Sequence, residues 1–258
     1  MATKTLKTLK TVPKISVKIW RPSIVRLDAK IETACLRRDA YLAKVLEVEL
    51  DWLDNEVSIP NSQASYDYVF DRLDRLDRKL VSLALPSELT ARLNEICSRK
   101  RIVRDAFFNR IFLLLAFEPQ VVDALLFGKV GDGWRTEVWS ENKHDGPFFQ
   151  NGFYPLEPQI DPFWAIRNGL ELYANEAELE DYVEPTSGKS IRVVRDFTGA
   201  VAPADSLYTT VFEQKLRDNN DLLGLSCYMP DWRIPGHGAE QERRAKLDEL
   251  FAGLEALP

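Results

Sequence analysis

The chain has 258 residues, of which 45% are hydrophobic and 10% aromatic, enough for one large or two ordinary domains. No run approaches the roughly 18 uninterrupted apolar residues that a membrane-spanning helix needs, and the basic N-terminus lacks the apolar stretch of a secretory signal. The three cysteines lie far apart, which excludes paired zinc-ligand spacing and a closed disulfide framework. We therefore expect a cytoplasmic protein without membrane contact.

The net charge of −6 conceals two halves of opposite sign. Residues 1–118 contain 21 Lys and Arg against 16 Asp and Glu, a net charge of +5, whereas residues 119–258 contain 13 against 24, a net charge of −11. This asymmetry predicts a flexible basic arm over residues 1–12, a basic domain over residues 13–118 and an acidic domain over residues 119–258. A basic arm leading into a structured basic unit favours contact with phosphate.

The first structured segment, about residues 14–57, has the pattern of a strand followed by two helices. Apolar and polar residues alternate from Ile15 to Arg21, which predicts a strand with one buried face, and Pro22 ends it. Apolar residues then recur at helical spacing in two stretches. Ser23 and Asp39 are residue types that cap helix N-termini, so we expect one helix to begin after each of them.

The same order of parts returns about 65 residues later, over residues 79–118. Residues 81–85 alternate and predict a second strand, and Pro86-Ser87 ends it and begins a helix. The start of the next helix, Arg104-Asp105-Ala106-Phe107, matches Arg38-Asp39-Ala40-Tyr41 in the first copy. The chain therefore contains a tandem repeat of one strand and two helices.

Both copies resemble the ribbon-helix-helix superfamily of repressors related to Arc and MetJ. The stretch from Val17 to Pro22, followed by Asp39, has the spacing of that family, and the second copy is two residues longer between Pro86 and Asp105. Because a lone strand cannot satisfy its backbone groups, family members pair two strands into an antiparallel ribbon. A connecting helix over residues 62–78 is long enough to bring the second strand beside the first. The resemblance thus implies a single-chain pseudo-dimer.

The resemblance also implies which residues contact DNA. In this family the ribbon enters the major groove, its outward side chains read base edges, and the starts of the second helices hold phosphates. The side chains that this places at base edges are Ser16, Lys18, Trp20 and Ser82. Those that it places near phosphates are Lys14, Arg21, Arg38, Lys79 and Arg104. The expected inward residues are Val17, Ile19, Val81 and Leu83. The outward side chains of the second strand have little hydrogen-bonding reach, so asymmetric readout is expected.

The acidic half, residues 119–258, alternates strand-like and helix-like pieces and predicts a small α+β domain. The segment Ser187-Gly188-Lys189-Ser190 ends like a phosphate-binding loop, but Val183 stands where that motif requires glycine. His144 and His237 have neither a cysteine nor a second histidine nearby. We therefore predict no cofactor, no metal site and no catalytic residue here.

Taken together, the sequence predicts an α+β protein in which a tandem ribbon-helix-helix pseudo-dimer precedes a small α+β domain. Its expected role is sequence-selective binding of double-stranded DNA, as a transcriptional repressor or as the DNA-binding component of a mobile-element, toxin–antitoxin or defence system, without enzymatic activity. Two alternatives stay open. One is a scaffold whose acidic domain binds a protein partner such as a toxin; the other is a metal-dependent hydrolase or nuclease that uses Asp145 or Asp161. Further self-association also stays open.

Overall fold

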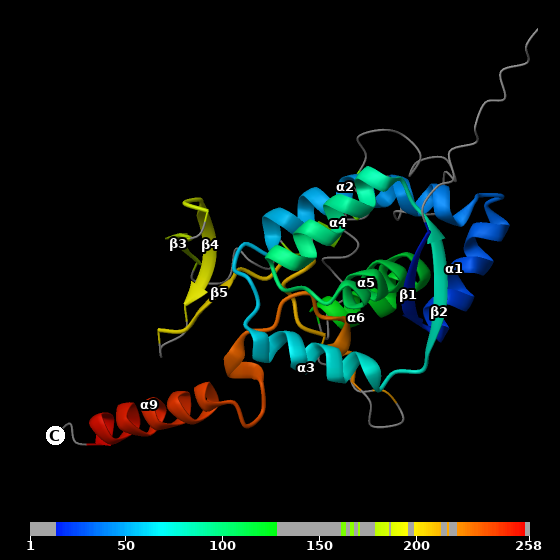
Figure 1. Cartoon of the computed structure of the whole chain (residues 1–258). Coiled ribbons are helices and arrows are strands. Elements are labelled where there is room, and N and C mark those ends of the chain that lie inside the picture. The colour runs from blue at the N-terminus through cyan, green and yellow to red at the C-terminus, as the bar shows by residue number, and fades with distance from the viewer. Residues whose placement is uncertain are drawn as a thin grey trace, which may run out of the picture.

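The computed structural model describes residues 14–127, 161–163, 166–167, 170, 179–185, 187–195, 199–212, 216 and 221–255. Over these residues the chain is a mixed α+β protein with one two-stranded and one three-stranded antiparallel sheet (Figure 1). The basic arm over residues 1–12, Asp145 and His144 lie outside the described residues.

Residues 14–127, which include the basic domain and the first residues of the acidic half, form two strands and six helices. They are β1 (Lys14–Trp20), α1 (Arg21–Thr33), α2 (Arg38–Glu56), α3 (Gln63–Asp74), β2 (Arg78–Ala84), α4 (Ser87–Arg99), α5 (Arg104–Ala116) and α6 (Pro119–Phe127). The strand-helix-helix order is therefore present twice, as the sequence predicts. The connecting helix α3 is shorter than the expected range of residues 62–78, and β2 begins at Arg78 instead of residue 81.

Strands β1 and β2 pair antiparallel along their whole length, with Val17 opposite Val81 at the centre. The inward side chains Val17, Ile19, Val81 and Leu83 are buried, which confirms that part of the prediction. The helices of the two copies pack crosswise, because α1 contacts α5 and α2 contacts α4. Neither copy covers its own apolar surface, so each depends on the other for a closed core.

The predicted N-caps are wrong in detail. Helix α1 begins at Arg21, and Ser23 lies inside its first turn with a buried side chain. Helix α2 begins at Arg38, so Asp39 is also inside the first turn, and its carboxylate makes no cap hydrogen bond. Pro22 is compatible with an early helix start because the first turn needs no N–H from it.

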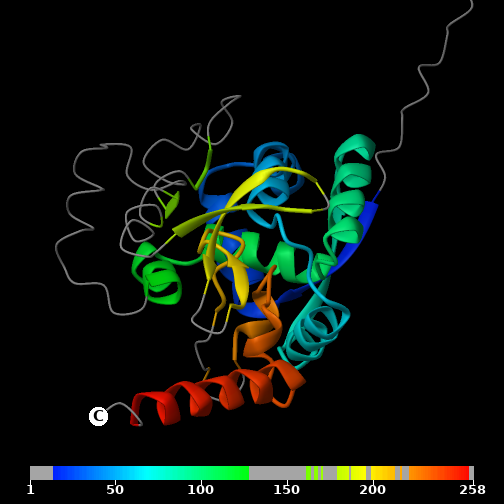
Figure 2. The ribbon, with the colours of Figure 1, turned by 90° about the vertical axis from the view of Figure 1, so that its left-hand side faces the viewer.

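The described residues from 179 onward contribute three strands, two short 3-10 helices and one long helix. They are β3 (Leu179–Val183), β4 (Ser190–Arg195), β5 (Val201–Pro203), η2 (Leu223–Leu225), η3 (Asp231–Arg233) and α9 (Gly238–Glu255). The sheet order is β3-β4-β5, and the sheet lies on the side of the molecule away from β1 and β2 (Figures 1 and 2). The C-terminal helix α9 projects from the body in both views.

One hydrophobic core runs through both halves. Leu207, Tyr208 and Phe212 belong to the same buried cluster as Phe107 of α5. At Gly224 the backbone of η2 approaches α3 so closely that an added Cβ would lie 2.3 Å from the Leu73 nitrogen. The core is therefore continuous across the point where the composition changes. Among the described helices, none combines the length and apolar character that crossing a bilayer requires.

Candidate nucleic-acid interface

The ribbon exposes a small polar surface on the side opposite the core. We call this surface the ribbon face, and it consists of the exposed side chains of Lys14, Ser16, Lys18, Leu80 and Ser82. Ser16 lies opposite Ser82, and Lys18 lies opposite Leu80, whose side chain is 63% exposed. Alternation along paired strands places these residues side by side on one surface.

The positively charged side chains at the ribbon differ in whether they form ion pairs within the protein. Among the described residues, no ion pair involves Lys14, Lys18 or Lys79. Arg21, in contrast, is paired with Asp77 at 2.8 Å, and this exposed pair raises the pKa of Arg21. Lys14 and Lys18 are therefore the cations of the ribbon face best placed to meet an external anion, and Lys79 is a further exposed lysine near the start of β2, opposite the buried Ile19.

Helix α5 covers the free edge of β1 with three side chains. The Arg104 guanidinium donates to the Ser16 carbonyl oxygen (3.1 Å), and the Asp105 carboxylate accepts from the Lys18 backbone nitrogen (3.1 Å). The Asn109 side-chain oxygen accepts from the Trp20 nitrogen (2.7 Å), while its amide nitrogen donates to the Lys18 carbonyl oxygen (2.8 Å). Edge groups that would otherwise invite another strand are thus occupied.

Sequence reasoning missed the role of Asn109. It is fully buried beside Arg110, between Phe107-Phe108 and Ile111-Phe112, and a buried amide is costly unless its hydrogen bonds are made. Two polar residues between pairs of large apolar ones were the signal that buried polar side chains bond to another part of the chain. Its bonds fix the ribbon against α5.

The edge of β2 is held by the equivalent residue of the first copy. The Asp39 carboxylate accepts from the Ala84 nitrogen at 3.0 Å, as Asp105 does from Lys18. Neither α2 nor α5 has a side-chain cap, so both second helices begin beside the ribbon with their first N–H groups uncapped by side chains. Both aspartates therefore lie in the first turns of their helices, and their carboxylates bond to the backbone of the ribbon.

Two expected DNA-contacting arginines are engaged within the protein. The Arg38 guanidinium pairs with Asp28 at 3.1 Å, and the Arg104 guanidinium is bonded to the Ser16 carbonyl. Both side chains are only partly exposed. They lie at the starts of α2 and α5, beside the ribbon, as the sequence predicts.

Trp20 lies at the end of β1 and packs inward. Its ring stacks on Phe117 with 5.6 Å between centroids and an interplanar angle of 4°, and the Arg26 guanidinium lies 4.8 Å from the Phe117 ring. Trp20 is half-buried, in contrast to Ser16 and Lys18. Its ring therefore anchors the end of the strand, and the readily accessible side chains are those of the ribbon face.

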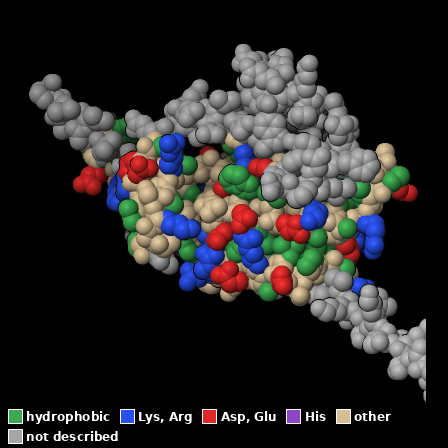
Figure 3. Space-filling view, turned by 90° about the horizontal axis from the view of Figure 1, so that it is seen from above, with side chains coloured by type: hydrophobic (Ala, Val, Ile, Leu, Met, Phe, Trp, Pro, Cys, Tyr) green, Lys and Arg blue, Asp and Glu red, His purple; other side chains and the backbone are tan. Residues whose placement is uncertain are grey.

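The surface over α2 and α4 has a different character. Figure 3 views the molecule from above and shows Lys and Arg side chains interspersed with Asp and Glu. The ion pairs Arg92–Asp51 and Arg99–Asp54 join these two helices. Because the charges neutralise one another, this surface is a weaker anion-binding candidate than the ribbon face.

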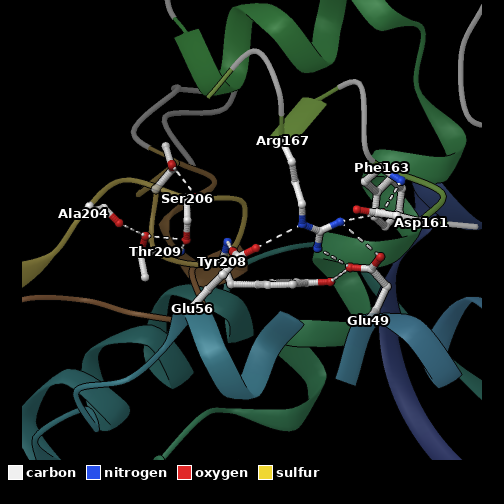
Figure 4. Close-up of polar contacts among 10 residues, drawn as sticks. Glu49, Glu56, Asp161, Phe163, Arg167, Ala204, Ser206, Tyr208 and Thr209 are labelled. Carbon is white, nitrogen blue, oxygen red and sulfur yellow. Dashed lines mark hydrogen bonds and ion pairs between the residues drawn. The ribbon is translucent and has the colours of Figure 1, made fainter. Parts of the chain in front are cut away.

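A buried ionic cluster joins the acidic half to α2 (Figure 4). The Arg167 guanidinium donates to Glu49 (2.7 Å), Glu56 (3.0 Å) and Asp161 (2.6 Å). The Tyr208 hydroxyl also donates to Glu49, and the Tyr208 nitrogen donates to Glu56 at 3.0 Å. Asp161, one of the two carboxylates of the hydrolase alternative, is thus held by a protein cation.

Burial dominates the electrostatics of this cluster. It raises the pKa of Glu49 to about 7, because desolvation outweighs the attraction of Arg167. Burial also raises the pKa of Tyr208, and the nearby Glu49 carboxylate adds to that effect. The described residues contain no group of three or more ligands suited to a metal ion. The arrangement is that of an internal ion pair that ties two parts of the chain together.

Comparisons of the chain with family models, with curated proteins and with solved structures found no match. Its function is therefore inferred from the geometry of its own residues.

Proposed function

We propose that this chain binds double-stranded DNA sequence-selectively, as a single-chain ribbon-helix-helix pseudo-dimer whose ribbon face enters the major groove. The observation that carries the proposal is the antiparallel pairing of β1 with β2, centred on Val17 and Val81, with the helices of each copy packed on those of the other. A two-stranded ribbon fits the width of the major groove. Such a protein acts as a transcriptional repressor or as the DNA-binding component of a mobile-element, toxin–antitoxin or defence system.

Each side chain of the ribbon face has a chemical role in this proposal. Lys18 donates to the O6 and N7 acceptors of guanine, and Ser16 and Ser82 exchange hydrogen bonds with neighbouring base edges. Lys14 and Lys79, at opposite ends of the ribbon, neutralise phosphates, which positions the ribbon without reading sequence.

The unequal strands imply an asymmetric site. Lys18 lies opposite Leu80, so one half of the ribbon offers a cation where the other offers an exposed apolar side chain. Leucine cannot donate a hydrogen bond, but it can contact the methyl group of thymine. The preferred DNA site is accordingly non-palindromic, with a guanine on one side and a thymine on the other.

Salt dependence of binding tests the phosphate contacts. We expect the affinity for duplex DNA, measured by fluorescence anisotropy, to fall steeply with salt, and Lys79→Ala to reduce the slope of log K against log salt by about 1. Lys189→Ala is the matched control, because Lys189 directly precedes β4 in the chain, and β4 lies on the side of the molecule away from β1 and β2 (Figure 1). Salt-independent binding, or equal slopes for Lys79→Ala and the unchanged protein, would contradict the proposal.

A further inference from the structure

A cleft of about 510 Å³ is lined by residues of α3, the C-terminal half of α4 and the start of α5. Its volume lies within the range of small-molecule sites, roughly 300–1,000 Å³. Its lining includes Tyr66 and Phe70 of α3 and, from just after α4 and from the start of α5, Arg101, Arg104 and Asp105. Aromatic rings and guanidinium groups in the lining of one cleft suit a flat ligand that carries negative charge.

The two aromatic side chains of the cleft, Tyr66 and Phe70, are accessible to solvent. The Phe70 side chain is 49% exposed although it is a large apolar ring, and Tyr66, one helical turn away on α3, is only partly buried. Residues four apart on a helix project from the same side. The two rings therefore lie on the same side of α3, where a flat ring can pack against them.

The two arginines of the cleft, Arg101 and Arg104, have N–H groups that are not used within the part of the protein that the structure describes. One Arg101 nitrogen donates to the Asn61 carbonyl oxygen at 3.1 Å, and a guanidinium has five N–H groups in all. Arg101 adopts a left-handed backbone conformation, with φ of 49°, at the end of α4. The Arg104 Nε is buried and has no hydrogen-bond partner among the described residues. An anion bound at either guanidinium group would receive charge-assisted hydrogen bonds.

The cleft and the ribbon share two residues. Arg104 lines the cleft and donates to the Ser16 carbonyl oxygen at the edge of β1, and Asp105 lines it while accepting from the Lys18 nitrogen. An anion bound by the Arg104 guanidinium competes with the Ser16 carbonyl oxygen for its N–H groups. It also competes with any DNA phosphate that binds at the start of α5. Binding in the cleft is thereby linked to the presentation of the ribbon face.

We propose that this cleft binds a small organic anion, a flat ring bearing a phosphate or carboxylate, and that its occupation weakens DNA binding. The regulatory part rests on the proposed DNA-binding function, whereas the binding part stands alone. Linkage requires that DNA weaken the ligand by the same factor. The ligand is thus an inducer in the sense that it releases the protein from its DNA site.

Calorimetry on the full chain without DNA tests the binding part. The probes are AMP and salicylate, with adenosine and salicylamide as their uncharged matches. We expect the charged probes to bind, the uncharged ones to bind at least several-fold more weakly, and Arg101→Asn to weaken AMP about tenfold. Asparagine tolerates the left-handed conformation, so this change removes the cation with little backbone strain.

Two further variants keep the result decisive. Phe70→Ala removes one of the two aromatic rings of the cleft from an exposed position and is expected to weaken the binding of both charged probes. Arg244 is an exposed arginine of α9, so Arg244→Ala is the matched control and should leave probe binding unchanged. Thermal melts confirm that each variant is folded. Absence of binding by both charged probes, or binding that survives Arg101→Asn and Phe70→Ala, overturns the site.

Anisotropy with labelled duplex DNA tests the regulation. Saturating probe is expected to weaken DNA binding about fivefold or more, and Arg101→Asn to abolish that effect without changing DNA affinity in the absence of probe. If Arg101→Asn alone weakens DNA binding and no probe binds, the cleft belongs to the DNA contact and the proposal is wrong. If the probes bind but no DNA does, the ligand site stands and the proposed function fails.

Discussion

Replacing Arg167 with methionine removes the guanidinium that Glu49, Glu56 and Asp161 share, while keeping an apolar side chain of similar length. The Glu49 side chain is fully buried, and those of Arg167 and Glu56 are 10% exposed. Without the cation, these carboxylates must lose charge or draw in water, because a buried unpaired carboxylate is costly.

The expected loss is about 3–5 kcal/mol in the free energy of unfolding at pH 7, the cost of removing one partner of a buried pair. The loss of stability should be smaller at pH 5 than at pH 7. At pH 5 Glu49, whose pKa burial raises, is protonated and therefore carries no charge that needs a partner. Arg167 also stacks 4.4 Å from the Trp52 ring, and methionine retains part of that contact. The electrostatic part of the loss should therefore predominate.

Urea unfolding, followed by circular dichroism at pH 5 and pH 7, measures both quantities. The control is Arg92→Met, which breaks the exposed pair with Asp51 and should cost less than about 1 kcal/mol. A loss below about 1 kcal/mol for Arg167→Met, or a loss independent of pH, would refute the view that this cluster fastens the acidic half to α2.

Further predictions concern packing, the ribbon edge and pH. Gly224→Ala should cost at least about 2 kcal/mol in thermal unfolding, since its Cβ would meet the Leu73 backbone at 2.3 Å. Asn109→Ala should lower the free energy of unfolding in urea by about 2 kcal/mol, because the backbone N–H of Trp20 loses its acceptor. An unchanged free energy of unfolding would mean that this hydrogen bond does not stabilise the fold. Burial raises the pKa of Glu49 from 4.5 to about 7, so the folded state binds more protons than the unfolded state between these values. Stability should therefore fall by up to about 3 kcal/mol as pH rises through that window, and Glu49→Gln should flatten the slope; an unchanged slope would contradict this account.

The pattern of the basic half could be predicted because short-range rules determine it. Alternation in residues 15–21 and 81–85 indicated two strands and their inward faces, and antiparallel pairing followed from the backbone groups that a lone strand leaves unsatisfied. Element boundaries were less accurate. Helix α1 begins two residues before the expected cap Ser23, because Pro22 itself is favourable in a first turn.

The contacts that hold the ribbon could not be predicted from local pattern. Asp39 and Asp105 were expected to lie at helix starts, and they do, but their carboxylates accept from Ala84 and Lys18, far away in the sequence. An aspartate near a helix start is favourable whether it caps the helix or bonds elsewhere, so sequence alone does not distinguish the two.

The buried cluster lay beyond sequence reasoning for a related reason. Glu49 belongs to an otherwise regular amphipathic helix, and its partner Arg167 is 118 residues away. Nothing in either neighbourhood indicates that the two meet. The composition change near residue 119 suggested a separate acidic domain, whereas Tyr208 and other described residues of that half lie in the shared core.

Selection from a random duplex pool, followed by sequencing of the bound fraction, tests the central claim most directly. The proposal predicts an enriched, non-palindromic motif, and Lys18→Ala should lower discrimination at one guanine by about 1–3 kcal/mol while Lys189→Ala leaves the motif unchanged. Absence of enrichment, or a motif that Lys18→Ala leaves intact, would contradict sequence reading by the ribbon face.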